Sequence, residues 1–148
     1  MIIAIDPGNV TGIATYKGTT FDSFEIDEIG KVYSYLWNVK ARADVMIIEK
    51  FTINPTTHKK SRQEDPLMII GFVDGLAYLH RIQLTYFTPA KAKSFATDDK
   101  LRAVDWWRPT PGGHANDAAR HLLTFIAQNK KAAWNTLHEP DNSLEEAR

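Results

Sequence analysis

Three acidic residues of this chain stand where a catalytic site could form. Asp6 and Glu49 each end an apolar run that reads as a buried strand, and Asp117 follows His114 by three residues in a stretch with helical spacing. A hard cation such as Mg²⁺ takes several oxygen ligands, and phosphoryl transfer often uses such cations. The three acids therefore predict a metal-dependent phosphoryl-transfer site, assembled from distant parts of one sheet-based fold.

The predicted chemistry explains why several acids would be needed. Hydrolysis of a phosphodiester adds charge to a group that is already anionic, and two divalent cations about 3.5–4 Å apart can activate the water and hold the leaving oxygen. Several carboxylates must converge to hold both ions, and strand ends and helix starts are rigid enough to fix them. His114 and Asp117 share one helix face because they are spaced i, i+3.

Each of these residues also has a plain structural interpretation. Asp6 precedes a Pro-Gly pair and could organise a turn through its side chain, whereas Glu49 could be a solvated strand end. His114 could cap a helix, and Asp117 could be a favourable charge near the helix N-terminus. The joint pattern favours the catalytic interpretation, because each acid lies beside a run that must be buried.

The elements that position these acids form an alternating pattern. Apolar runs and tight turns predict five strands, over residues 2–6, 12–16, 19–26, 45–51 and 82–87. Helical spacing and proline at first turns predict five helices, over residues 29–37, 66–81, 89–96, 100–107 and 114–130. This order predicts an α/β fold with a mixed five-stranded sheet, in which three antiparallel meander strands and two parallel strands are flanked by helices.

Length and composition fit one domain. The chain has 148 residues, of which 43% are hydrophobic, and it has no cysteine, which excludes disulfides and thiolate zinc sites. We expect a nuclease domain over residues 1–130 and a polar, disordered tail over residues 131–148. No apolar run approaches the roughly 20 residues of a membrane span, and there is no basic leader. We therefore expect a cytoplasmic protein that does not bind membranes.

The net charge is zero, but the charges are unevenly distributed. Residues 29–138 hold sixteen basic and nine acidic residues, whereas residues 1–28 hold five acidic residues and one basic one. A basic middle fits a nucleic-acid face, and solvated surface charge is the alternative. Two basic stretches are candidates for phosphate contacts. They are Lys59, Lys60 and Arg62 in a polar loop over residues 52–65, and Lys91, Lys93, Lys100, Arg102 and Arg108 further along.

The remaining aromatic and histidine residues give weaker signals. Trp106 and Trp107 could stack on bases or pack in the interior, and we favour packing. Three further histidines, His80, His121 and His138, form no ligand pattern, and we interpret them as structural or solvated.

A set of short motifs in this chain resembles RuvC-type Holliday junction resolvases. The motifs include Ile-Ala-Ile-Asp-Pro-Gly around Asp6, Ile-Ile-Glu ending at Glu49, and a glycine-rich approach to His114 and Asp117. The first of these two late positions is Asp in some family members and His in others. The matching segments, in order along the chain, are residues 3–8, 11–14, 47–49, 71–75, 87–93 and 111–118.

This resemblance implies a fold, an activity and partners. The fold would be RNase H-like, and the protein would be a homodimer that binds branched DNA. Each subunit would use two Mg²⁺ or Mn²⁺ ions to nick one of two symmetric strands of a four-way junction, leaving 5′-phosphate and 3′-hydroxyl ends. The metal ligands carried over by the motifs are Asp6, Glu49, His114 and Asp117.

The resemblance also implies three further site residues. Lys93 matches a lysine that follows the fifth strand of the family, and Lys100 is the candidate for a second one. The chain lacks the glycine-containing loop that usually separates the two lysines. Phe51 stands nearest to the family's base-stacking aromatic, at a slightly different offset, and core packing is its alternative.

Other functions are compatible with parts of the same pattern. A nuclease that acts on structured RNA shares the first strand and the acidic set. A junction-binding protein that does not cut would need none of the metal ligands. The loop after Asp6 loosely resembles the phosphate loop of actin-like kinases, but those enzymes need two lobes, for which 148 residues leave no room.

Overall fold

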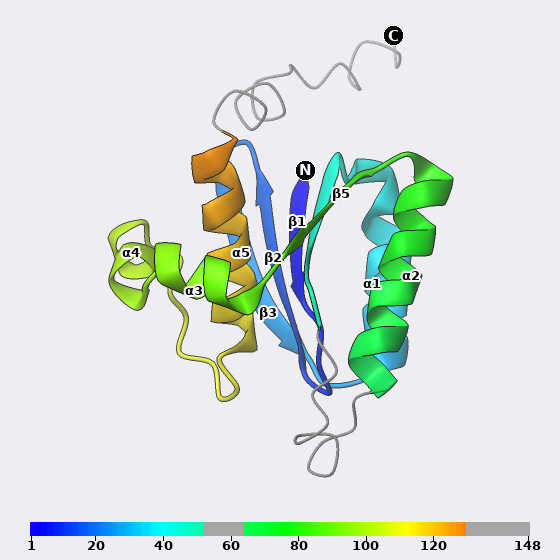
Figure 1. The fold of residues 1–148 in the computed structure, drawn as a ribbon, viewed down its shortest axis with the longest axis horizontal. Helices are drawn as coiled ribbons and strands as arrows, with labels where there is room; N and C mark the ends of the chain where they lie inside the picture. The colour runs from blue at the N-terminus through cyan, green and yellow to red at the C-terminus, as the bar shows by residue number, and fades with distance from the viewer. Residues whose placement is uncertain (52–63, 130–148) are drawn as a thin grey trace, which may run out of the picture.

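The computed structural model of the chain describes residues 1–51 and 64–129 (Figure 1). Within these ranges the strands are β1 (Ile2–Asp6), β2 (Thr11–Lys17), β3 (Thr20–Ile26), β4 (Val45–Glu49) and β5 (Gln83–Phe87). The helices are α1 (Ile29–Val39), α2 (Glu64–His80), α3 (Pro89–Phe95), α4 (Asp98–Ala103) and α5 (His114–Gln128), and a short 3₁₀ turn, η1 (Lys40–Arg42), follows α1.

The strands form one mixed sheet in the order β3-β2-β1-β4-β5. The β1–β2 and β2–β3 pairs are antiparallel, as short turns between consecutive strands require, whereas β1–β4 and β4–β5 are parallel and are connected through helices. The predicted α/β fold, with three meander strands and two parallel strands, is confirmed. Strand β1 lies at the centre of the sheet, and all five of its residues are buried.

Helices cover both faces of the sheet and enclose two cores (Figure 1). Helices α1 and α2 pack on one face, and α5, with α3 and α4 beside it, packs on the other. This arrangement explains the nearly continuous apolar runs of β1 and β4, because a strand covered on both faces cannot alternate between apolar and polar residues.

The alternation of side chains along a strand decides which face each acid joins. In β1, Ile5 packs in the core beneath α1 and α2, whereas Ala4 packs in the core beneath α5. Asp6 follows Ala4 by two positions, and Glu49 follows Ile47, another residue of the α5 core, by two positions. Both acids therefore lie on the face of the sheet that α5 covers.

Helix α5 begins very close to the backbone of β2. A Cβ atom added at Gly12 would lie 1.9 Å from the carbonyl oxygen of His114 and 3.0 Å from the backbone nitrogen of Ala115. No side chain fits in that space, so the first turn of α5 can rest on the sheet only where β2 carries a glycine. Since Gly12 pairs with Asp6 across the β1–β2 ladder, this contact brings the start of α5 beside Asp6.

Several predicted boundaries are wrong. Strand β4 ends at Glu49 and not at residue 51, and α2 begins at Glu64, inside the predicted loop. The helix predicted over residues 100–107 runs from Asp98 to Ala103 instead, because Asp105 adopts a left-handed backbone with a φ of 59° and ends the helical path.

The predicted tail over residues 131–148 lies outside the described residues. Among the helices within the described residues, none combines the length and the apolar character needed to cross a membrane.

We predict that Gly12→Ala lowers the free energy of unfolding by about 1–3 kcal/mol, the usual cost of overpacking, because backbone atoms of α5 must move away from the sheet. Urea unfolding followed by circular dichroism measures this change. Gly30→Ala is the matched control: it lies exposed near the start of α1, where its new methyl group meets only a side-chain oxygen of Glu28 at 3.7 Å. The control should be neutral or stabilising by up to about 1 kcal/mol. Equal unfolding curves for Gly12→Ala and the wild type would contradict the close contact.

Candidate active site

The predicted acids meet at one edge of the sheet. Ile5 of β1 pairs with Ile48 of the parallel strand β4, so Asp6 and Glu49, each the next residue, leave neighbouring strands at the same edge. The first turn of α5 lies at the end of the sheet where β1 finishes (Figure 1). The structure therefore brings the four predicted ligand residues together from β1, β4 and α5.

Asp6 and His114 form the most direct contact in this group. The Nδ1 atom of His114 lies 2.9 Å from Oδ2 of Asp6, and Asp6 is only 6% exposed. Burial raises the pKa of Asp6, the hydrogen bond from His114 opposes that rise, and the charges of Glu49 and Asp117 add to it. The hydrogen bond to Asp6 in turn raises the pKa of His114. The carboxylates of Glu49 and Asp117 therefore both lie close enough to Asp6 to raise its pKa.

Glu25 holds the start of α5 in place. The N-cap residue of α5, Gly113, has a φ of 74° and no side chain with which to cap the helix. Instead, Oε1 of Glu25, on β3, accepts hydrogen bonds from the backbone N–H of His114 at 2.8 Å and of Ala115 at 3.3 Å. Burial acts to raise the pKa of Glu25, but Thr110 and these N–H groups hold that pKa below its usual value. A carboxylate from another strand therefore performs the capping that the local sequence lacks.

Asp117 is held between two cations. The Nζ atom of Lys93, on α3, lies 3.1 Å from Oδ2 of Asp117, and Nε of Arg120 lies 3.1 Å from Oδ1. Arg120 also donates to the carbonyl oxygen of Ala96 at 3.0 Å and pairs with Asp98. This guanidinium therefore ties the carboxylate to the junction of α3 and α4. The sequence analysis did not identify Arg120, although its i, i+3 spacing from Asp117 is a usable signal.

Glu49 is paired with a histidine that we had interpreted as structural or solvated. The Nε2 atom of His121 lies 2.8 Å from Oε2 of Glu49, and His121 is only 1% exposed. It is therefore buried and in contact with a predicted ligand. His121 lies seven residues after His114 and four after Asp117, which puts all three on one helix face. This spacing could have identified His121 as a candidate site residue from the sequence.

The group can be tested for its fit to a divalent cation. Within residues 1–51 and 64–129, no three acids or histidines surround one point closely enough, as they stand, to hold an ion. The donor set itself fits, since three carboxylates and one imidazole beside a buried surface are suitable ligands for Mg²⁺ or Mn²⁺. The charges of Glu49 and Asp117 add to the rise in the pKa of Asp6, and a bound cation would offset their effect. The metal-ligand roles of Asp6, Glu49, His114 and Asp117 stay predictions.

Three of the six predicted DNA-contacting residues lie within the described ranges. Lys91 is exposed, with Nζ 4.3 Å from the ring centre of Phe87. Lys100 is also exposed, and its Nζ donates to the carbonyl oxygen of Phe95 at 2.6 Å. Phe51 is half-buried, two residues beyond Glu49. The remaining candidates, Lys59, Lys60 and Arg62, lie outside the described residues.

The tryptophans pack against the protein, as we favoured. The Trp106 ring stacks on Phe21 with ring centres 4.3 Å apart and planes 5° apart, and it also contacts Tyr16. Trp107 lies beneath the guanidinium of Arg102, at 4.3 Å. Both indoles are partly buried against the α5 core, so they help to fasten the loop before α5 to the sheet.

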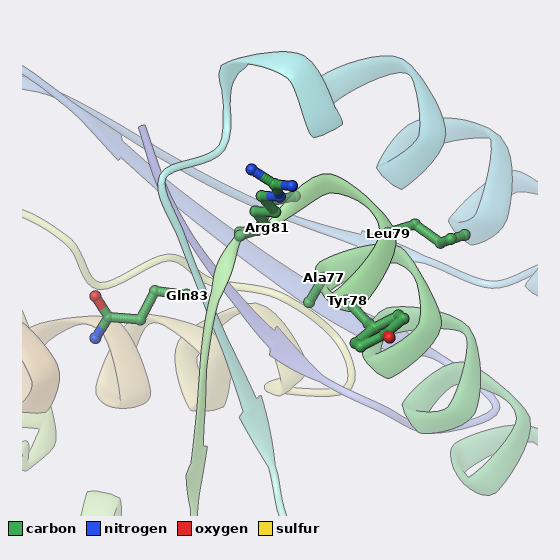
Figure 2. Close-up of a pocket in the computed structure, with 6 residues that line it drawn as sticks. Ala77, Tyr78, Leu79, Arg81 and Gln83 are labelled. Atoms are coloured by element: carbon green, nitrogen blue, oxygen red, sulfur yellow. The ribbon is translucent and has the colours of Figure 1, made fainter.

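A surface pocket lies away from the acids. Ala77, Tyr78, Leu79, Arg81, Ile82 and Gln83 line it, where α2 ends and β5 begins (Figure 2). Since β5 is parallel to β4, the start of β5 lies at the edge of the sheet opposite Glu49. This lining carries one charged group and no acid, and the pocket is therefore not the candidate active site.

Solved structures show what this fold resembles. RuvC from T. thermophilus in complex with a Holliday junction substrate superposes with a TM-score of 0.65 and 14% identity, covering 88% of this chain and 95% of that one. A second Thermus thermophilus RuvC structure gives a TM-score of 0.60 and 16% identity, over 87% and 96%. The fowlpox virus Holliday junction resolvase gives 0.53 and 16%, over 86% and 98%.

The comparisons agree with the predicted fold. No protein-family model matches the chain, and no curated protein sequence matches it. Because the identities are low, the superpositions show the fold alone. It is the RNase H-like fold of the T. thermophilus RuvC and fowlpox virus resolvase structures. The fold expected from the motif resemblance is confirmed.

We predict that Glu25→Ala lowers the free energy of unfolding by about 1 kcal/mol, the typical cost of a lost N-cap, since two N–H groups of α5 lose their acceptor. Glu25→Gln should keep most of the stability, because its side-chain oxygen can still accept. Thermal and urea unfolding measure both variants. Asp22→Ala, at an exposed acid of the same strand, controls for the change of charge. If Glu25→Ala is no less stable than Asp22→Ala, Glu25 does not cap α5.

Proposed function

We propose that this protein is a divalent-metal-dependent endonuclease that cuts branched DNA, with four-way junctions as its main substrate. The observation that carries the proposal is the meeting of Asp6, Glu49 and Asp117, with His114, at the carboxyl edge of β1 and β4 in an RNase H-like sheet. Asp6 is buried beside two further acids that raise its pKa, which is unfavourable for an ionised carboxylate, and a bound divalent ion would offset that cost.

The chain's own residues suggest how the site would work. Asp6, Glu49, His114 and Asp117 would hold two Mg²⁺ or Mn²⁺ ions. When bound, such ions supply an activated water and stabilise the charge on the leaving oxygen, giving 5′-phosphate and 3′-hydroxyl ends. Asp6 has the most buried carboxylate of the group and lies at the centre of the sheet, so it defines the floor of the site.

Lys93 would act on the substrate side of this floor. Its side chain is 57% exposed, although Nζ pairs with Asp117. A partly exposed ammonium at the margin of an acidic site can turn toward an incoming phosphate and neutralise charge that develops on it. Arg120 remains in contact with Asp117, so that carboxylate would keep a partner when Lys93 moves.

Support for a branched-DNA substrate comes from the surface and from the fold. Exposed lysines on α3 and α4, Lys91 and Lys100, lie on the side of the sheet that carries the acids, where they can contact phosphates. The RuvC structure from T. thermophilus, with the same fold, was solved with a Holliday junction substrate. We extend that substrate class to this chain as part of the proposal.

We also propose that the active form is a homodimer, since two symmetric nicks need two sites. Helix α2 is the candidate contact, because its outward face keeps large apolar side chains in solvent: Met68 is 54%, Tyr78 85% and Leu79 72% exposed. Gly71 and Gly75 lie along this helix with no atom within 4 Å of an added Cβ, so a second backbone could approach closely.

We predict that Asp6→Asn lowers the rate of junction cutting by about 10³-fold or more, because losing a charged ligand removes several kcal/mol of transition-state stabilisation. Junction binding should change little, because lysines and not Asp6 would contact the phosphates. Denaturing gels of a labelled four-way junction in Mg²⁺ or Mn²⁺ measure cutting, and gel shifts in Ca²⁺ measure binding. The control is Asp44→Asn, the same chemical change in an exposed acid before the opposite end of β4.

The same assay separates the alternatives. Paired nicks in the junction by the wild type support the proposal, whereas faster cutting of structured RNA at matched concentration would assign the protein to RNA. Tight junction binding without nicks in either metal would mean that the protein binds branched DNA and does not cut it. Normal cutting by Asp6→Asn would show that the site is elsewhere.

We predict that Gly75→Lys converts the dimer to a monomer, since a charged side chain would enter the centre of the α2 contact. The monomer itself should fold normally, because space around Gly75 is open. Light scattering with size-exclusion chromatography gives the molar mass. Gly30→Lys, at an exposed position on α1, is the matched control and should remain dimeric. A Gly75→Lys variant with an unchanged dimer mass would exclude α2 as the contact.

A further inference from the structure

Helix α5 carries a buried histidine beneath Glu49. His121 is 1% exposed, and it lies among apolar side chains of the α5 core, with its ring centre 6.2 Å from that of Phe87. Phe87 is the β5 partner of Glu49 in the sheet. His121 therefore approaches Glu49 from the face of the sheet that α5 covers. A leucine would fill such a position at less cost, because a buried polar ring needs a partner.

The contacts of His121 define which nitrogen carries the proton. Nε2 lies 2.8 Å from Oε2 of Glu49, and an ionised carboxylate can only accept, so Nε2 must donate. Nδ1 is buried, and among the described residues it has no hydrogen-bond partner. A neutral ring with its proton on Nε2 leaves only an acceptor unpaired, whereas any other protonation state would bury an unpaired N–H group. The structure therefore favours the Nε2–H tautomer.

We propose that His121 is a positioning residue that fixes the carboxylate of Glu49 for divalent-ion binding; the inference rests on the proposed function. The side chain of Glu49 has three rotatable bonds and is 17% exposed, so it needs an anchor to present one orientation. A hydrogen bond from a buried, immobile ring to Oε2 supplies that anchor. Carboxylates that bind metal ions are commonly oriented by such a second contact.

The position of His121 on α5 strengthens this inference. His114 reaches Asp6 from the first turn of the helix, and His121 reaches Glu49 from seven residues further along the same face. One rigid helix thus contacts the acids of both parallel strands, while Asp117 lies between the two histidines.

Two amide variants separate positioning from packing. Gln places its side-chain nitrogen near the position of Nε2 and can still donate to Glu49, whereas Asn reaches only to the position of Nδ1. Both bury an amide of similar polarity, so a purely structural role of His121 predicts similar losses for the two. The positioning role predicts that His121→Asn weakens Mn²⁺ binding about 10- to 100-fold and that His121→Gln restores most of it.

Calorimetric titration of the metal-free full-length protein with Mn²⁺ provides this readout without any cutting assay. Thr124→Val is the control for disturbance of α5: it removes the buried hydroxyl that donates to the Arg120 carbonyl, one turn beyond His121 and without contact to Glu49. It should bind Mn²⁺ like the wild type. Equal affinities for His121→Asn and His121→Gln would overturn the inference.

Nuclear magnetic resonance of the wild-type ring covers the case in which neither amide variant folds. Nitrogen-15 spectra should show His121 protonated on Nε2, and this N–H resonance should shift when Mg²⁺ binds. A ring protonated on Nδ1 alone, or a resonance that stays unchanged while Mg²⁺ binds, would overturn the inference. A wild type that binds neither ion at millimolar concentration would instead overturn the proposed function, and the reason for positioning Glu49 with it.

Discussion

The constraint on which this structure depends is the gathering of three like charges beside a buried surface. The charges of Glu49 and Asp117 both raise the pKa of Asp6, and the burial of Asp6 limits how far water can screen them. In the described structure each acid has a donor of its own: His114, His121, and Lys93 with Arg120. All of these donors except Lys93 belong to α5, so the folded state keeps its charges together only if this helix is held accurately.

The parts of the site that could be predicted are those with a local cause. A strand covered on both faces must be apolar, so β1 and β4 were visible as runs, and an acid at the end of each run could be identified without any structure. The parallel pairing of those strands then places Asp6 and Glu49 at one edge.

The parts that were missed have causes far away in the sequence. Glu25 caps α5 from 89 residues earlier, and no pattern near either residue indicates it. Arg120 and His121 lie at helical spacing from Asp117, yet without the sheet nothing shows that a carboxylate faces them. The predicted boundary of α4 was wrong because Asp105 adopts a left-handed backbone conformation, and nothing in the local sequence requires that conformation. Alternation along β1 and β4, by contrast, could have shown that Asp6 shares a face with Ala4, and Glu49 with Ile47.

Part of the interface between α5 and the sheet is built from alanine, alongside larger apolar residues. Ala118 and Ala119 of α5 share this core with Ala4 of β1 and Ala14 of β2, and all four are fully buried. Alanine has no side-chain rotamers, so these positions cannot adjust their conformation when the helix is displaced. A displacement of α5 would therefore move the side chains at its first turns by a similar amount. The distance between the backbones of α5 and the sheet, which these alanine methyl groups help to set, therefore determines where the side chains of the acidic site lie.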